Sequence, residues 1–288
     1  MLIEKIDNQL NKKKFQRRHA GKVVMVSGAS SGIGKALAIE LLNRGFSVSL
    51  AARRDEIIIS HLRESFPEEV YEKRCFVMRT DVSREEDCKN WVEATYRHFG
   101  RIDVLINNAG ISMRGLFEEC NLDVLRRLVD VNFWGVTYCT HYALKYLLET
   151  KGSVVGVSSI AGYQPLPGRT AYSASKAAMQ GLLTNIRIEN RKKGLHVLIV
   201  CPGFTASNVR INALDKNGNP QGETPRDEGK MMTAEEVARH MIWAIDRRKR
   251  SLILTPLGRL TVLASKIIPG FTEKVAFSYM AKEPNSPF

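Results

Sequence analysis

The sequence predicts a single α/β domain in which a doubly wound parallel sheet carries helices on both faces. Short, wholly apolar segments alternate along the chain with longer segments whose apolar residues recur at helical spacing. Strands that are apolar at every position are buried on both faces, as in a parallel sheet covered by helices. No linker or internal repeat divides residues 21–255, so we expect one domain there.

Each predicted element follows from its local pattern. Six apolar runs predict strands at residues 22–26, 46–51, 75–78, 103–106, 153–157 and 197–200. Four segments with helical spacing predict helices at residues 34–44, 84–99, 122–150 and 172–193. A capping box formed by Thr233 and Glu236 predicts the start of one more helix. This order is typical of parallel strands joined by crossover helices.

Three segments depart from this alternation. Residues 1–20 form a basic arm, and residues 204–232 are polar and rich in Gly, Pro, Asn and Asp. Because residues 204–232 directly follow a strand end, where doubly wound folds bind ligands, we expect a mobile substrate lid there. Residues 256–288 form an amphipathic C-terminal tail, which we expect to pack on the protein itself, on a second subunit or on a membrane.

The formal net charge of +13 narrows the possible partners. Basic residues concentrate in the arm and in a second block at residues 247–250. No helix-turn-helix, zinc finger or aromatic-basic repeat accompanies them, so we expect no binding to nucleic acid. Two interpretations stay open: attraction to an anionic membrane surface, or a solvated basic face that also attracts an anionic cofactor.

Cysteine spacing and hydropathy indicate a cytoplasmic protein. The five cysteines lack CxxC or metal-like spacing, so we expect reduced thiols and no metal site. Residues 1–20 are too polar for a secretory signal, and the chain has no apolar run of the roughly 20 residues that span a membrane. Peripheral contact with a membrane surface through the arm and the tail stays open.

Tyr172 and Lys176 are the first candidates for chemistry. If residues 172–193 form a helix, the spacing of these two residues places both side chains on one face, one turn apart. A nearby ammonium favours the phenolate, so a phenol with an ordinary pKa of about 10 can exchange a proton near neutral pH. Such a group can protonate or deprotonate a carbonyl oxygen. An ordinary surface pair has the same spacing, so the assignment depends on further motifs.

A glycine-rich turn and two arginines predict a nucleotide site. The turn reads Ser27-Gly28-Ala29-Ser30-Ser31-Gly32-Ile33-Gly34 and lies between the first strand and the first helix. Its glycines allow a pyrophosphate to approach backbone N–H groups at the helix N-terminus. Arg53 and Arg54 end the second strand, where an acidic residue favours NAD and guanidinium groups favour the 2′-phosphate of NADP.

Several further motifs occur along the chain in a fixed order. They are Thr80-Asp81-Val82, Asn107-Asn108-Ala109-Gly110, Asn132, Ser159 and Pro202-Gly203. With the glycine turn and the Tyr172/Lys176 pair, they resemble the short-chain dehydrogenases/reductases, a family of single-domain Rossmann-fold enzymes. The resemblance covers roughly residues 20–250. Arg53 and the amphipathic tail resemble most the lipid- and steroid-type members, such as hydroxysteroid dehydrogenases and ketosphinganine reductases.

The resemblance implies roles for four catalytic residues. Tyr172 is expected to be the general acid/base, and Lys176 to bind the nicotinamide ribose and lower the pKa of Tyr172. Ser159 is expected to hold the substrate oxygen, and only its spacing to Tyr172 favours it over Ser158. Asn132 is expected to hold a water that links Lys176 to solvent.

The same resemblance implies which residues hold the cofactor. Asp81 is expected to accept a hydrogen bond from the adenine amino group, with Val82 beside the ring, and Asn107 to help hold neighbouring strands together. The implied cofactor-binding set is Gly28, Ser30, Ser31, Gly32, Ile33, Gly34, Arg53, Arg54, Asp81, Val82, Asn108, Ala109, Gly110, Tyr172, Lys176, Pro202, Gly203 and Ser207.

Together these features predict an NADP(H)-dependent oxidoreductase that interconverts a hydrophobic ketone or aldehyde and its alcohol. An NAD(H)-dependent alcohol dehydrogenase of the same family and a non-catalytic nucleotide-binding scaffold are the alternatives. We expect the substrate pocket between residues 111–117, residues 161–170 and the lid. Its apolar members are Met113, Leu116, Phe117, Tyr163, Leu166 and Phe204. The resemblance also implies a homodimer or homotetramer that associates through the helices at residues 122–150 and 172–193.

Overall fold

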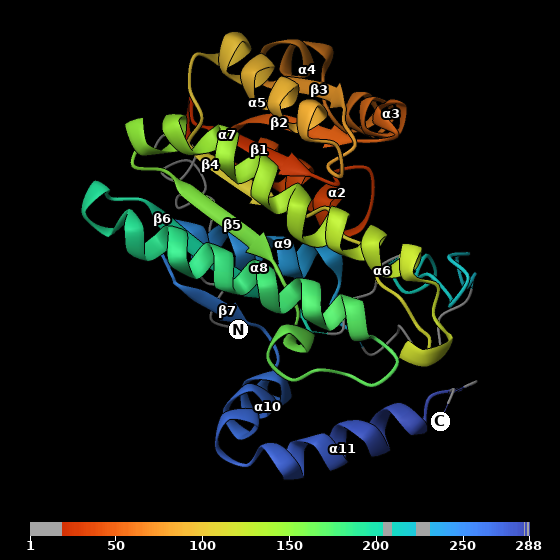
Figure 1. Cartoon of the computed structure of the whole chain (residues 1–288). Coiled ribbons are helices and arrows are strands. Elements are labelled where there is room, and N and C mark those ends of the chain that lie inside the picture. Colours follow the sequence, from red (N-terminus) through yellow and green to blue (C-terminus); the bar gives the residue numbers. More distant parts are fainter. Residues whose placement is uncertain (1–18, 204–208, 223–230, 285, 287) are drawn as a thin grey trace.

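The structure, a computed structural model, describes residues 19–203, 209–222, 231–284, 286 and 288 (Figure 1). Its strands form one parallel sheet in the order β3-β2-β1-β4-β5-β6-β7. They are β1 (Val23–Ser27), β2 (Ser47–Ala52), β3 (Cys75–Arg79), β4 (Val104–Asn107), β5 (Ser153–Val157), β6 (His196–Cys201) and β7 (Ser251–Ile253). The predicted doubly wound parallel sheet is confirmed.

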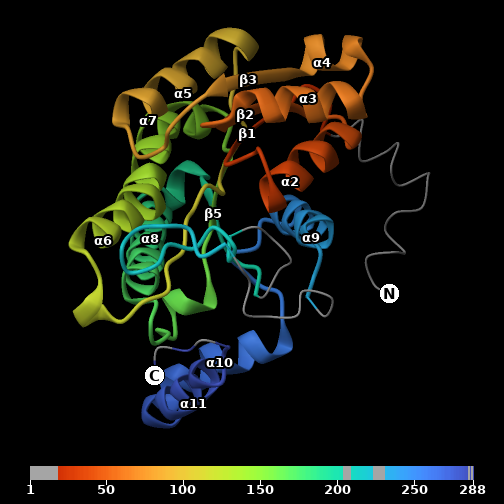
Figure 2. The same ribbon diagram turned by 90° about the vertical axis from the view of Figure 1, so that its right-hand side faces the viewer.

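Helices cover both faces of this sheet. In chain order they are α2 (Gly32–Asn43), α3 (Asp55–Ser65), α4 (Glu68–Arg74), α5 (Glu85–Phe99), α6 (Leu122–Val129), α7 (Gly135–Glu149), α8 (Thr170–Glu189), α9 (Ala234–Asp246), α10 (Pro256–Ile267) and α11 (Pro269–Ala281). The helices α2, α3 and α9 pack on one face, and α5, α7 and α8 pack on the other (Figures 1 and 2). The sheet is therefore the middle of three layers.

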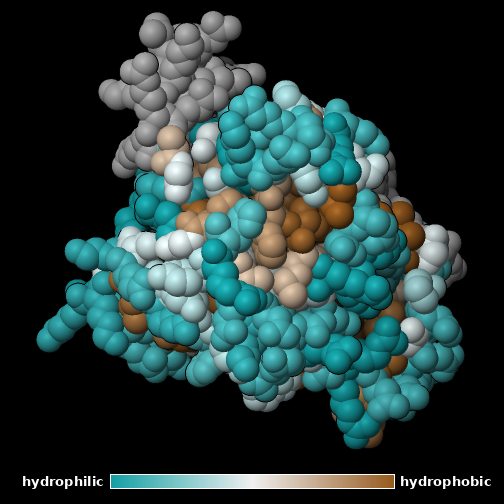
Figure 3. Space-filling model, turned by 90° about the horizontal axis from the view of Figure 1, so that it is seen from above, coloured by the Kyte–Doolittle hydropathy of each residue, from teal (hydrophilic) through white to brown (hydrophobic). Residues whose placement is uncertain are grey.

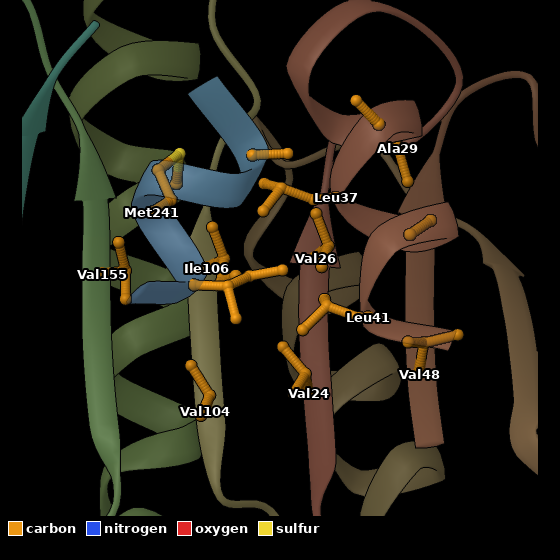
Figure 4. Packing of buried hydrophobic residues seen from close by; sticks show 14 of the residues in the cluster. Val24, Val26, Ala29, Leu37, Leu41, Val48, Val104, Ile106, Val155 and Met241 are labelled. Atoms are coloured by element: carbon orange, nitrogen blue, oxygen red, sulfur yellow. The ribbon is translucent and has the colours of Figure 1, made fainter. Parts of the chain in front are cut away.

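Strand β1 shows why the central strands are apolar at every position. Val24 and Val26 belong to a buried cluster with Leu37 of α2 and Met241 of α9 (Figure 4). Met25, which lies between them in the sequence, belongs to the cluster on the opposite face, under α5 and α7. Because successive side chains of a strand point to opposite faces, a sheet that is covered on both sides buries them all.

The sequence pattern missed three features of this fold. β7 has only three residues and therefore shows no periodicity, and α3 and α4 were not expected as separate helices. The helix predicted for residues 122–150 is divided into α6 and α7 by a π-helical turn at Asp130–Trp134. Such turns occur frequently at functional sites, and this one contains Asn132.

Part of the expected lid packs on the loop that follows β4. Leu214 forms bridges with Met113 and Pro220, and the Asn121 N–H at the start of α6 donates to the Lys216 carbonyl over 2.9 Å. These contacts hold residues 209–222 next to the predicted pocket wall. The other lid residues, 204–208 and 223–230, lie outside the described residues, as do residues 1–18 of the arm.

The upper side of the molecule is mainly hydrophilic, with a smaller apolar area near its middle (Figure 3). Exposed apolar side chains lie on the two tail helices, α10 and α11. On α10, the side chains of Leu257, Leu260 and Ile267 are each more than 60% exposed. Within the described residues, none of the helices combines the length and apolar character that crossing a bilayer requires. The five cysteines are buried free thiols.

Candidate active site

Tyr172 and Lys176 lie one turn apart near the start of α8, as their spacing predicts. Lys176 is buried, and its Nζ donates to the carbonyl of Val157, the last residue of β5, over 2.8 Å. The same Nζ lies 5.8 Å from the centre of the Tyr172 ring. The ammonium is therefore held between the end of a central strand and the phenol ring.

The environment of Tyr172 raises the pKa of its phenol. Desolvation by burial is the main cause, while a hydrogen bond with Ser159 and the charge of Arg169 act in the opposite direction. Burial therefore sets the direction of the shift in the pKa of Tyr172, and not the lowering that was expected from Lys176. Tyr172 is consequently protonated at neutral pH and can serve as a proton donor.

Burial acts on Lys176 in the other direction. Desolvation lowers the pKa of its ammonium to about 8, because an apolar surrounding disfavours the charged form. Nearby Cys201 is also buried, and its pKa is raised to about 12, so its thiol is neutral at pH 7. Lys176 is thus charged at neutral pH but can release its proton about one pH unit above it.

Ser159 is close to Tyr172, whereas Ser158 is not available to it. Ser159 begins a short 3₁₀ turn after β5, where its Oγ accepts from the Ala161 N–H over 3.1 Å. The Ser158 hydroxyl instead accepts from Nε2 of Gln180, two turns further along α8, over 2.8 Å. The structure therefore distinguishes the two serines by contact as well as by spacing.

Asn132 connects the loop after β4 to α8. Its Oδ1 accepts from the Ile111 N–H over 2.9 Å, and its Nδ2 donates to the Ile111 carbonyl over 2.9 Å and to Ser175 Oγ over 3.1 Å. A Cβ on Gly110 would lie 3.1 Å from Asn132 Oδ1 and 3.3 Å from Lys176 Nζ. The π-helical turn thus brings Asn132 and Lys176 to the same glycine.

The glycine-rich turn is packed against the carboxyl end of β4. Gly28 and Gly32 have positive φ angles of 67° and 52°, and a Cβ on Gly34 would lie 2.2 Å from the Gly28 carbonyl oxygen. Only glycine fits such a position. Asn108 fastens the turn, since its Nδ2 donates to the Ser27 and Gly28 carbonyls over 2.9 and 3.1 Å.

Asn107 was expected to help hold neighbouring strands together, and it is paired with Gly156 of β5 in the sheet. Asn107 Nδ2 donates to Thr140 Oγ1 of α7 over 3.1 Å, so it ties β4 to a helix. Asn108 and Ala109 join β4 to β1, because their N–H groups donate to Ser27 Oγ over 3.0 and 3.1 Å. Residues 107–109 therefore join β4 to α7 and to both neighbouring strands.

A hollow of about 390 Å³ lies beside the turn, between the first residues of α2 and α3. It is lined by Ser30, Ser31, Gly32, Lys35, Arg54, Ile57 and His61. Both arginines are exposed, but Arg54 borders this hollow and Arg53 is not part of its lining. Sequence reasoning missed Lys35, although it follows Ser31 by one helical turn and therefore shares its face.

The other residues that were expected to bind the cofactor lie at the same edge of the sheet. The Asp81 carboxylate accepts from the Ser83 N–H and hydroxyl over 3.0 and 2.7 Å. Val82 is buried beside Gly135, the first residue of α7. Gly203 has a φ of 78° next to Thr255. Ser207 and Phe204 lie outside the described residues, and the described part of the chain shows no cluster of His, Cys, Asp or Glu that could hold a metal.

Comparison with known proteins shows which family of proteins this chain resembles in sequence. A family model described as short chain dehydrogenase matches residues 22–218. The chain is 41% identical over 210 residues to 11-beta-hydroxysteroid dehydrogenase A of Arachis hypogaea, a match that covers 73% of this chain and 58% of that protein. It is 32% identical over 280 residues to the Dictyostelium discoideum dehydrogenase/reductase SDR family protein 7-like, covering 94% of this chain and 87% of that protein.

A solved structure extends the likeness to three dimensions. A short-chain dehydrogenase from Streptomyces avermitilis superposes with a TM-score of 0.74 at 28% identity, covering 91% of this chain and 98% of the other. The plant relatives are longer proteins, and this chain spans less than two thirds of their length, 58% in the Arachis case.

The buried ammonium gives a first prediction. Lys176→Met removes a charge whose pKa is lowered to about 8 by burial, so the variant should have a higher free energy of unfolding than the wild type at pH 7. In the wild type, the unfolded chain binds more protons than the folded one between about pH 8 and 10.5, so its stability rises there. The advantage of the variant should shrink by about 2 kcal/mol between pH 7 and 9.5.

Chemical denaturation at the two pH values measures this difference. Lys192→Met, a change at an exposed lysine beyond the end of α8, is the control for general effects of pH. A stability difference between Lys176→Met and the wild type that is the same at both pH values would contradict the assignment of a low pKa to Lys176.

Proposed function

This chain belongs to the short-chain dehydrogenase/reductase family, and from that premise we propose that it is an NADP-dependent oxidoreductase that interconverts a hydrophobic ketone or aldehyde and its alcohol. One observation carries the proposal. Ser159, Tyr172 and Lys176 lie together at the ends of the central strands. They are next to a turn in which only glycine fits. The carboxyl edge of a doubly wound sheet is where such folds bind ligands.

The residues present fit a dinucleotide. The turn offers N–H groups at the start of α2 and has no side chain at Gly28 or Gly34 that would keep a pyrophosphate away. When bound, the nicotinamide supplies or accepts the hydride. Because Gly110 has no side chain, space remains beside Asn132 and Lys176. This space suits a ribose bound by Lys176.

In the direction of reduction, Tyr172 donates its phenolic proton to the carbonyl oxygen. Its raised pKa keeps this proton available at neutral pH. Ser159 holds the same oxygen and stabilises the negative charge that develops on it, an effect worth roughly 3 kcal/mol for one donor. Lys176, with a pKa of about 8, replaces the proton on Tyr172. In the direction of oxidation the same groups accept the proton.

The hollow beside the turn supports NADP over NAD. Lys35 and Arg54 bring two cationic side chains to it, and Ser30 and Ser31 add hydroxyl groups, a combination suited to a phosphate. The described lining contains no carboxylate, the group that would bind the ribose hydroxyls of NAD. This replaces Arg53 with Arg54 as the first candidate for the 2′-phosphate.

Titration of NADPH and NADH into the wild type, Arg53→Ala and Arg54→Ala tests this choice. We expect the wild type to prefer NADPH, and Arg54→Ala to lose about tenfold in NADPH affinity while NADH affinity changes little, because only NADPH carries the phosphate. Arg53→Ala should have the smaller effect. Tighter binding of NADH by the wild type would overturn the cofactor proposal and favour an NAD-dependent alcohol dehydrogenase.

Removal of the phenol tests the chemistry. Tyr172→Phe should reduce turnover by at least about a hundredfold, because it deletes the proton donor. Cofactor affinity should stay within about twofold of the wild type, since the ring remains. Steady-state rates and fluorescence titration measure the two effects. Turnover in Tyr172→Phe would refute the mechanism, and a wild type that binds nucleotide but reduces none of a broad set of ketones would favour a scaffold.

The expected substrate pocket has apolar walls. Relatives of this chain are named hydroxysteroid dehydrogenases, and the walls of the expected pocket contribute apolar groups such as Leu116, Tyr163 and Leu166. Met113 is fully buried and packs in one cluster with Tyr172 and Leu214, so it supports the wall from behind. We therefore propose a fused-ring or similarly hydrophobic carbonyl compound, of the kind that the names of the relatives suggest.

The family also suggests a homodimer or homotetramer. Two exposed apolar side chains lie in the segments that we expect to associate: Trp134, the last residue of the π-helical turn before α7, and Ile188, near the end of α8. Sedimentation velocity measures the state directly, and a monomer at micromolar concentration would contradict this part of the proposal.

The tail offers a surface for peripheral contact with an anionic membrane. Leu257, Leu260, Leu263 and Ile267 form an exposed stripe along α10, and Phe271, Val275 and Tyr279 continue it on α11. Arg259, Lys266, Lys274 and Lys282 are the exposed charged groups around them, against Glu273 alone. Apolar side chains edged by cations match the interface of an anionic bilayer.

Vesicle co-sedimentation tests this surface. The double variant Leu260→Gln/Leu263→Gln should bind vesicles that contain anionic lipid about tenfold less than the wild type, because it removes two apolar side chains from the interface. The control is Phe117→Gln/Val209→Gln, which changes two exposed apolar residues of the body outside the helices that we expect to associate. Equal binding by both variants and the wild type would remove the membrane proposal and leave a second subunit as the partner of the tail.

A further inference from the structure

A buried carboxylate anchors the far end of the tail. Glu283 follows α11, and its side chain is only 5% exposed. Its Oε2 lies 3.8 Å from Arg114 Nε and 3.7 Å from an Arg169 guanidinium nitrogen, and both arginine side chains are about as buried. A carboxylate is stable in such a place only when opposite charges compensate its loss of water. We call Glu283, Arg114 and Arg169 the latch.

The two arginines come from the two loops that frame the substrate end of the site. Arg114 lies in the loop after β4, and it donates from its guanidinium to the Pro284 carbonyl. Arg169 directly precedes α8, and its Nη1 donates to the Met113 carbonyl over 3.0 Å. The loops also meet directly, where the Gly115 N–H donates to the Gly168 carbonyl over 3.0 Å.

Packing contacts place both ends of the tail against the loop between β5 and α8. Gly258 of α10 packs on Ile160, the residue after Ser159, so closely that a Cβ would lie 2.5 Å from Ile160 Cδ1. At the other end, Phe288 packs beside Gly168 and lies 5.4 Å, ring to ring, from Phe277 of α11. Figure 1 shows α11 running beneath the loop that joins β5 to α8.

Arg169 connects the latch to the reacting groups. It begins the turn of helix that carries Tyr172, and the Ser173 N–H donates to the Arg169 carbonyl over 2.8 Å. Arg169 Nη1 also donates to Ser112 Oγ over 3.3 Å. The loop after β4 therefore holds the Arg169 side chain at a second point. A shift of Arg169 would therefore move one pocket wall and the start of α8 together.

We propose that Glu283 is a positioning residue that latches the tail onto both substrate-pocket loops, so that the tail forms part of the substrate site. The carboxylate neutralises two cations that would otherwise repel each other across the gap between the loops, and the strain of that repulsion would open the pocket. The claim about substrate rests on the proposed function. The claim about the loops does not, because it concerns the protein without any ligand.

Hydrogen exchange measured by mass spectrometry on the full chain tests the latch. Glu283→Gln keeps the shape of the side chain and removes its charge, and Glu273→Gln, an exposed change on α11, is the control. We expect amide exchange in residues 112–117 and 163–169 to rise about fivefold or more in Glu283→Gln alone, because local opening becomes easier. Faster exchange confined to the tail, with both loops unchanged, would overturn the proposal.

Kinetics separates positioning from simple loss of stability. With NADPH saturating, KM for a fused-ring steroid ketone should rise about tenfold in Glu283→Gln, while kcat for the small ketone cyclohexanone and the affinity for NADPH stay within about twofold. Equal losses with both ketones and with NADPH would mean a general structural role and would overturn the proposal. If the wild type turns over neither ketone, the substrate class fails, and the exchange result alone decides the latch.

A second variant covers the possibility that Glu283→Gln fails to fold. Arg114→Gln leaves Glu283 paired with Arg169 and removes one of the two loops from the latch, so it should show the same pattern with a smaller amplitude. The double variant Arg114→Gln/Glu283→Gln should be no worse than Glu283→Gln, because both changes remove the same contact. Fully additive effects on exchange and KM would contradict the latch.

Discussion

The close contact between the glycine-rich turn and the end of β4 is the constraint on which the site depends. Gly34 has no room for a side chain against the Gly28 carbonyl, and Asn108 and Ser27 bind the two strand ends together. β1 and β4 are neighbours in the sheet, yet their chains leave to opposite sides of it. The fastening therefore fixes the crevice where the strand order reverses, and this is where a doubly wound fold binds its ligand.

The reacting groups are placed at a cost to the fold. Lys176 and Tyr172 lie where burial disfavours the charged form of each, which lowers one pKa and raises the other. The two pKa values are thereby moved apart, and transfer of a proton from the Lys176 ammonium to a Tyr172 phenolate becomes favourable. The hydrogen bonds of Lys176 to Val157 and of Asn132 to Ile111 hold this arrangement between β5, α8 and the π-helical turn.

The sequence predicted the parts of this structure that have a local signal. Apolar runs located six of the seven strands, and the spacing of Tyr172 and Lys176 placed both on one helical face. The π-helical turn escaped detection because its residues have the same apolar spacing as the helices on either side. Lys35 and Arg54 come together only because α2 and α3 start side by side. The latch joins residues far apart in the sequence, for which no periodicity exists.

The separation of the latch residues also bears on how the chain folds. Arg114 and Pro284 are 170 positions apart, so their contact closes a very long loop. Contacts of this kind form late, because the entropy of loop closure opposes them until the intervening elements are in place. The contact between β1 and β4 that fixes the nucleotide crevice closes a shorter loop, since Ser27 and Asn108 are 81 positions apart. A refolding chain would accordingly acquire its affinity for nucleotide first and its discrimination among substrates last.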